Sequence, residues 1–147
     1  MAIKTSTGLR NAMLDTGSFK SIMDGGTVKI YSGAVPADAD AALGSAVLLV
    51  PITNASTATG VTMAAAAVAG VLTKTVAEVW SGVNVATGMA SFYRFVTAAD
   101  TGAASTTEKR VQGLCATAGS DMNMSDTTLT AAATHTQDFY SIALPSA

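Results

Sequence analysis

The chain has 147 residues, eight basic and ten acidic residues for a formal net charge of −2, and a single cysteine. This length fits one domain that can bury a core without a metal, and one cysteine excludes an intrachain disulfide. Hydrophobic residues make up 49% of the chain and charged residues only 12%, which excludes a disordered chain and gives no clustered basic face for nucleic acid.

The N-terminal segment is predicted to be helical. Ser6 or Thr7 can cap a first helix whose apolar residues share one face, and a second helical stretch covers residues 18–23. The run Asp24-Gly25-Gly26 ends it, because glycine tolerates the left-handed backbone found after helices. We therefore predict a single domain with an N-terminal helical arm at residues 1–26 and a β-sandwich at residues 27–147. No apolar segment of a secretory signal follows Met1.

From Thr27 onward the hydrophobic period changes to two, which predicts strands. Pro36–Gly44 is predicted as a loop that holds one helical turn, with Asp38 as its cap and Asp40 beside it. Short strands separated by turns, without a βαβ rhythm, favour a mainly β fold, an antiparallel β-sandwich or jelly roll. The predicted strands are residues 27–32, 46–53, 61–63, 76–80, 89–97, 110–116, 122–129 and 136–144.

One long stretch carries no charge. From Ala41 to Thr73 there is no Asp, Glu, Lys or Arg. The stretch is either a core hairpin with small-residue loops or a surface that meets another subunit, because the core of an interface is depleted of charge. Its most apolar part, Val61–Leu72, is about half as long as the roughly 20 residues of a membrane span. No membrane partner is expected.

The residues needed for catalysis are scarce. His135 is the only histidine, and Cys115 lies in an apolar strand where a thiol behaves as a small hydrophobe. The chain has no phosphate loop, dinucleotide fingerprint or nucleophile elbow. We therefore predict no enzyme, no catalytic, cofactor-binding or metal-binding residues, and no cofactor.

Two charged motifs could indicate a binding site and thus contradict this prediction. Asp121–Ser125 resembles the start of a calcium loop, but Asp126 and Ala132 replace the glycine and glutamate that the loop requires. The pair Lys109-Arg110 is interpreted as a solvated strand end, because no wider basic patch surrounds it.

Three segments resemble a group of small virion proteins encoded by tailed bacteriophages. They are Met1–Leu14, then Lys29–Gly33 followed by Pro36–Gly44, and Trp80–Gly82 followed by Gly88–Phe95. The resemblance implies a structural protein of the virion, assembled in the host cytoplasm. Its leading form is a capsid decoration, or cement, protein that forms a homo-oligomer on the particle, packs across neighbouring subunits of the major capsid protein, and extends its helical arm onto a neighbour.

Two alternatives stay open. The first is a tail, collar or baseplate component, whose partners are tail proteins. The second is a carbohydrate- or receptor-binding module, which usually presents exposed aromatic side chains. If the protein is a structural component of the capsid or of the tail, the expected packing surface is Ala41–Thr73 together with the helical arm before Gly25.

Overall fold

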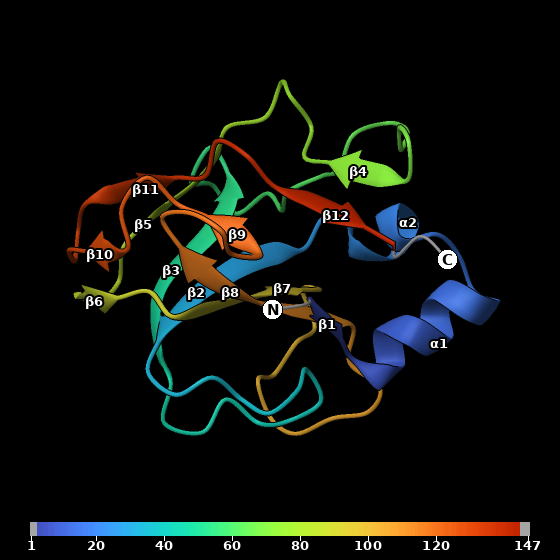
Figure 1. The fold of residues 1–147 in the computed structure, drawn as a ribbon, viewed down its shortest axis with the longest axis horizontal. Helices are drawn as coiled ribbons and strands as arrows, with labels where there is room; N and C mark the ends of the chain where they lie inside the picture. Colours follow the sequence, from blue (N-terminus) through green and yellow to red (C-terminus); the bar gives the residue numbers. More distant parts are fainter. Residues whose placement is uncertain (1–2, 145–147) are drawn as a thin grey trace.

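A computed structural model describes residues 3–144 and shows two short helices and twelve short strands within that range (Figure 1). In chain order the elements are β1 (Lys4–Thr5), α1 (Thr7–Asp15), α2 (Phe19–Met23), β2 (Thr27–Ser32), β3 (Val47–Asn54), β4 (Val71–Thr73), β5 (Trp80–Val83), β6 (Gly88–Met89), β7 (Phe92–Val96), β8 (Arg110–Ala116), β9 (Met122–Asn123), β10 (Thr128–Leu129), β11 (Thr134–Thr136) and β12 (Ser141–Ala143). The predicted strands 27–32 and 110–116 are confirmed residue for residue.

The fold is a mainly β, antiparallel sandwich with a small helical N-terminal arm, as predicted. The main sheet has the order β1-β8-β7-β2-β3-β5-β11, and each neighbouring pair is antiparallel. Two ribbons, β4–β12 and β6–β10, are also antiparallel. The exception is β9, which pairs with β8 in parallel over two residues.

The core lies between the main sheet and the β4–β12 ribbon, and aromatic rings join the two. Tyr140, just before β12, lies 5.5 Å from the ring of Trp80 on β5. It also meets Tyr93 and Phe95 of β7 edge to face, at 5.7 and 6.0 Å between ring centroids. All four side chains are buried. Edge-to-face packing of this kind adds to the free energy gained from burying the rings.

The helical arm is docked on its own domain. The Ser6 hydroxyl caps α1 by accepting a hydrogen bond from Leu9 N at 3.1 Å and donates to Glu108 O at 2.7 Å. Leu9 and Met23 are fully buried in the core. Strand β1 extends the main sheet by pairing with β8. In this structure the arm therefore packs within the chain, whereas the resemblance implied an arm that extends onto a neighbour.

Several predicted elements differ from the structure. The predicted strand 61–63 is reduced to isolated bridges at Val61 and Met63, the strand 89–97 is broken at residues 90–91, and the extended run 122–129 divides into β9 and β10. Val76–Trp80 was predicted as a strand, but the strand begins at Trp80, because the residues before it turn to place the Glu78 carboxylate inside. The strand predicted at residues 136–144 is interrupted by residues 137–140, where Tyr140 turns into the core. Pro36–Gly44 contains bends and no helical turn.

The outer face of the main sheet carries buried polar side chains beside Phe92 and Val96, and it is covered by two loops, residues 33–46 and 97–109, which lie below the sheet in Figure 1. Alternation along β7 places Arg94 on this face, opposite the core residues Tyr93 and Phe95. Arg94 is fully buried and donates to the carbonyl oxygens of Asp38 at 3.2 Å and Ala41 at 2.7 Å. It thereby holds the first loop against the sheet.

Arg110 of β8 holds both loops. Its buried guanidinium forms ion pairs with Asp100 and Glu108 of the second loop. It also donates to Ala103 O at 2.8 Å and to Ala39 O of the first loop at 3.2 Å. The interpretation of Lys109-Arg110 as a solvated strand end is therefore wrong for Arg110, because alternation turns this side chain under the loops.

Asp38 and Asp40 both act as caps, but not as predicted. Asp38 Oδ1 accepts from the amides of Asp40 and Ala41 and closes a turn of the loop. The Asp40 carboxylate accepts from Thr7 N at 2.9 Å and Thr7 Oγ1 at 2.6 Å, at the start of α1. These bonds to the charged form lower the pKa of Asp40. The first loop thus stabilises the helical arm.

Replacing Arg110 tests the buried ion pairs. We expect Arg110→Met to lower the free energy of unfolding by about 3–5 kcal/mol, because Asp100 would stay buried without a counter-charge. Urea denaturation at pH 7 measures this. Arg10 is exposed on α1, so Arg10→Met should change the free energy by less than about 0.5 kcal/mol. Equal losses in the two variants would contradict the assignment.

A second test concerns Asp40 and pH. Because the folded state lowers the pKa of Asp40, its stabilisation is present above the unfolded pKa and is lost as pH falls through the folded pKa. We expect Asp40→Ala to cost about 1 kcal/mol at pH 7, as for other helix caps, and less as the pH drops below about 4. Thermal unfolding at several pH values measures the difference. A cost that is independent of pH would show that the carboxylate charge is not involved.

Candidate interaction surface

The charge-free stretch divides between core and surface. Its first part, β3, lies inside the main sheet, and Leu49, Val50 and Ile52 are fully buried. Its later part contains an exposed loop, Ala65–Gly70, made only of alanine, valine and glycine. The core reading therefore holds for β3, and the loop at residues 65–70 is available for contact.

Of the eleven large apolar side chains that are exposed among the described residues, five lie in two segments that run side by side, residues 64–79 and 137–144. Lys74 N donates to Tyr140 O, and Gln137 N donates to Trp80 O. Strand β4, just before Lys74, pairs with β12, just after Tyr140. Val76 is 92% exposed and Phe139 is 64% exposed. In Figure 1 both segments lie in the upper part of the view. We call the exposed set the apolar ridge: Val68, Val76, Val79, Phe139 and Leu144.

The ridge carries little free charge. Its two segments contain only three charged residues, Lys74, Glu78 and Asp138. Lys74 Nζ donates to Glu78 O at 2.8 Å and lies 5.8 Å from the centre of the Trp80 ring. Asp138 is exposed and forms no ion pair within residues 3–144. An exposed apolar surface with so little charge is typical of a protein interface.

Glu78 holds the turn that carries Val76 and Val79 of the ridge by hydrogen bonds. Its carboxylate accepts from Trp80 Nε1 at 2.9 Å, and from Thr62 N and Thr62 Oγ1 at 2.8 Å each. These bonds join the turn before β5 to the strand-like segment around Val61 and to the core tryptophan. Preorganised apolar side chains lose less conformational entropy on binding than mobile ones.

Only part of this surface was foreseen from the sequence. Val68 lies in the predicted stretch, whereas Val76, Val79, Phe139 and Leu144 lie in segments predicted as strands. Alternating apolar residues in a strand show that one face is apolar but not whether that face is buried. Leu14 of the helical arm is 87% exposed, but it lies far in the sequence from the residues of the apolar ridge.

The candidate side chains for chemistry have structural surroundings. Cys115 is buried, and burial raises the pKa of its thiol to about 12. His135 is buried on β11, where burial lowers its pKa, so the ring is neutral at pH 7. Asp121 Oδ2 accepts from Leu114 N at 2.9 Å and is occupied as a turn residue. Among residues 3–144 no three His, Cys, Asp or Glu side chains are grouped to hold a metal ion.

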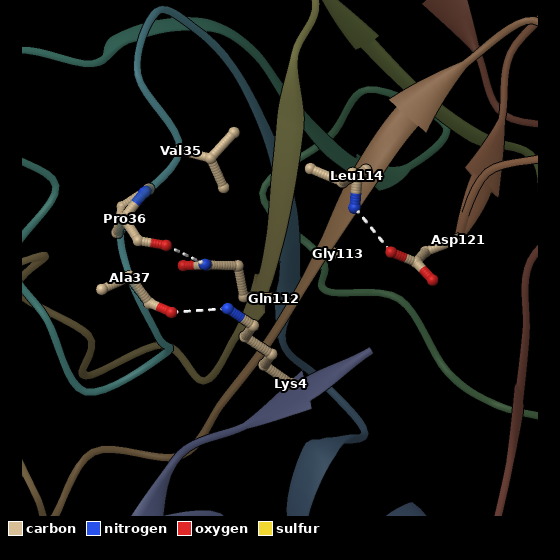
Figure 2. A pocket seen from close by; sticks show the side chains of 8 residues that line it. All are labelled: Lys4, Val35, Pro36, Ala37, Gln112, Gly113, Leu114 and Asp121. Atoms are coloured by element: carbon tan, nitrogen blue, oxygen red, sulfur yellow. Dashed lines mark hydrogen bonds between the residues drawn. The ribbon is translucent and has the colours of Figure 1, made fainter. Parts of the chain in front are cut away.

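A hollow of about 170 Å³ lies between the first loop and β8 (Figure 2). Lys4 Nζ donates to Ala37 O at 2.5 Å, and Gln112 Nε2 donates to Pro36 O at 2.8 Å. Asp121, on its other side, accepts from Leu114 N. Since each polar side chain drawn in Figure 2 is hydrogen-bonded within the chain, this hollow is a packing gap between loop and sheet.

Comparisons with protein-family models, curated proteins and solved structures found no match to the chain. Within the described residues, neither helix has the length and apolar character needed to span a membrane.

Replacing Glu78 tests its contribution to the ridge. We expect Glu78→Leu to lower the free energy of unfolding by about 2–3 kcal/mol, because Trp80 Nε1 and Thr62 N lose a charged acceptor. Urea denaturation followed by tryptophan fluorescence measures the loss. Glu78→Gln keeps an acceptor and should cost less. The same loss in both variants would mean that the hydrogen bonds do not stabilise this turn.

Proposed function

We propose that the protein is a non-enzymatic structural protein of a bacteriophage virion, most specifically a capsid decoration protein, and that it docks through the apolar ridge. The observation that carries the proposal is the ridge itself: five large exposed apolar side chains, two of them on a turn that Glu78 holds by hydrogen bonds, in a chain with half the usual charge. The position of His135 and Cys115, both buried and both neutral at pH 7, supports a structural role over catalysis.

The segments that carry the resemblance to virion proteins are adjacent in space. Tyr31 of β2 stacks on Phe92 of β7 with 5.1 Å between ring centroids. Arg94 of β7 holds the loop that contains Asp38 and Ala41. The segments 29–33, 36–44 and 88–95 therefore form one structural unit, the outer face and its cover. Because these segments hold the chain's own loops against its sheet, proteins that share the segments are expected to share this scaffold. We therefore assign docking to the ridge.

The proposed mechanism is burial of apolar area at repeated contacts. A specific interface usually covers about 800 Å² per partner, roughly a ninth of the 7171 Å² surface of this chain. Around a symmetric shell, many modest contacts to the major capsid protein act together and gain through multivalency. The carbohydrate-binding alternative is less well supported, because Trp80 and the three tyrosines are buried.

The proposal is tested by adding the protein back to particles. Expanded heads stripped of the protein should bind the unmodified chain in many copies per particle. Val76→Asp combined with Val79→Asp should weaken binding by about 100-fold or more, because each buried valine contributes roughly 1.5–3 kcal/mol. Sedimentation of heads with labelled protein measures the bound fraction.

The matched control is Leu14→Asp. Leu14 is as exposed as the ridge residues but lies on α1, so this variant should bind like the unmodified protein. Equal loss in both variants would overturn the assignment of the ridge. If stripped heads bind none of the protein while tails contain a few copies, the tail alternative replaces the capsid one.

A further inference from the structure

A second surface feature lies next to the apolar ridge. A hollow of about 370 Å³ opens at the end of the molecule that carries β10 and β11, and is lined by Asn84 and by residues of the segment 125–138. Asp138 lines it and is followed directly by Phe139 of the ridge. A partner that contacts Phe139 would therefore lie beside one wall of the hollow.

The hollow is negatively charged and has no basic side chain. Asp126 and Asp138 both line it, and neither forms an ion pair within residues 3–144. Asp126 Oδ1 accepts from Thr128 N at 2.8 Å, which fixes the carboxylate at the rim. No Lys or Arg occurs in the sequence after Arg110. His135, in the wall, does not neutralise the acids, because burial lowers its pKa and the ring is uncharged at pH 7.

A buried acceptor without a hydrogen-bond partner is a second observation at the hollow. Asn84, in the wall of the hollow, is only 4% exposed. Its Nδ2 donates to Thr130 O at 2.9 Å, but its Oδ1 has no hydrogen-bond partner in the described part of the chain. Buried polar atoms are almost always paired, so a missing donor at this wall points to a ligand that supplies N–H groups.

We propose that the hollow receives a lysine or arginine side chain from the protein on which the ridge docks. Residues with hydroxyl, amide and carboxylate groups line the site, and a guanidinium or ammonium group supplies several donors and a positive charge. A metal ion is a poorer fit, since no three metal-ligating side chains are grouped within residues 3–144. The partner surface is thus an apolar patch with one basic side chain beside it.

This inference rests on the proposed docking role, but it is tested with a small probe and without particles. The probe is N-acetyl-L-arginine amide, added to the ¹⁵N-labelled full chain at pH 7. Because His135 is the only histidine, its ring signals report on the hollow without overlap. We expect saturable shifts of the His135 ring and of amides in residues 125–138. N-acetyl-L-leucine amide, which lacks the charge, should leave these signals in place.

Variants decide whether the two carboxylates bind the probe. Asp126→Asn with Asp138→Asn keeps the side-chain shapes and should raise the dissociation constant at least about tenfold. Asp15→Asn, an exposed acid at the end of α1, should leave it unchanged. Unchanged binding in the double variant, equal shifts with the leucine probe, or saturation of the same signals by Ca²⁺ at lower concentration would each overturn the inference.

The same double variant separates this inference from the proposed function. If it binds stripped heads as well as the unmodified chain while Val76→Asp with Val79→Asp does not, docking through the ridge stands and the basic side chain is rejected. If both variants bind fully, the ridge itself is not the docking surface.

Discussion

The ion cluster around Arg110 is the interaction on which most of the outer structure depends. One fully buried guanidinium meets two carboxylates and two backbone carbonyls, and these acceptors come from both loops that cover the sheet. Arg94 holds the first loop at a second point. That loop in turn supplies Asp40 to the start of α1 and the carbonyl of Ala37 to Lys4. The N-terminal arm therefore depends on arginines that lie in β7 and β8.

A chain with few charged residues uses many of them inside itself. Arg94, Arg110, Asp100 and Glu78 have buried or half-buried side chains that hold loops and turns. The surface that results is poor in charge, and the part of it formed by residues 64–79 and 137–144 exposes five large apolar side chains. These four charged residues therefore stabilise the fold, and the ridge has little charge beside its apolar side chains.

Hydrophobic patterns in the sequence predicted where strands form better than which of their faces are buried. The change of period at Thr27 and the run Arg110–Ala116 predicted strands correctly, since alternation is a local property. The ridge was only partly predictable, because Val76 and Phe139 look like strand residues until the fold shows that their side chains are exposed. Arg110 was misassigned for a related reason. Its acceptors, Asp100 and the carbonyls of Ala39 and Ala103, come together only when two distant loops close over the sheet.

The arginines also determine which way β7 and β8 can face. Arg94, Gln112 and Arg110 share the outer side of the sheet, while Tyr93, Phe95 and Val111 point into the core. A shift of pairing by one residue would exchange the two sets. It would place two guanidinium groups among the rings of Trp80 and Tyr140, where no acceptor compensates their loss of hydration. The buried arginines therefore make misregistered sheets unstable during folding, which matters for a protein whose strands are mostly short.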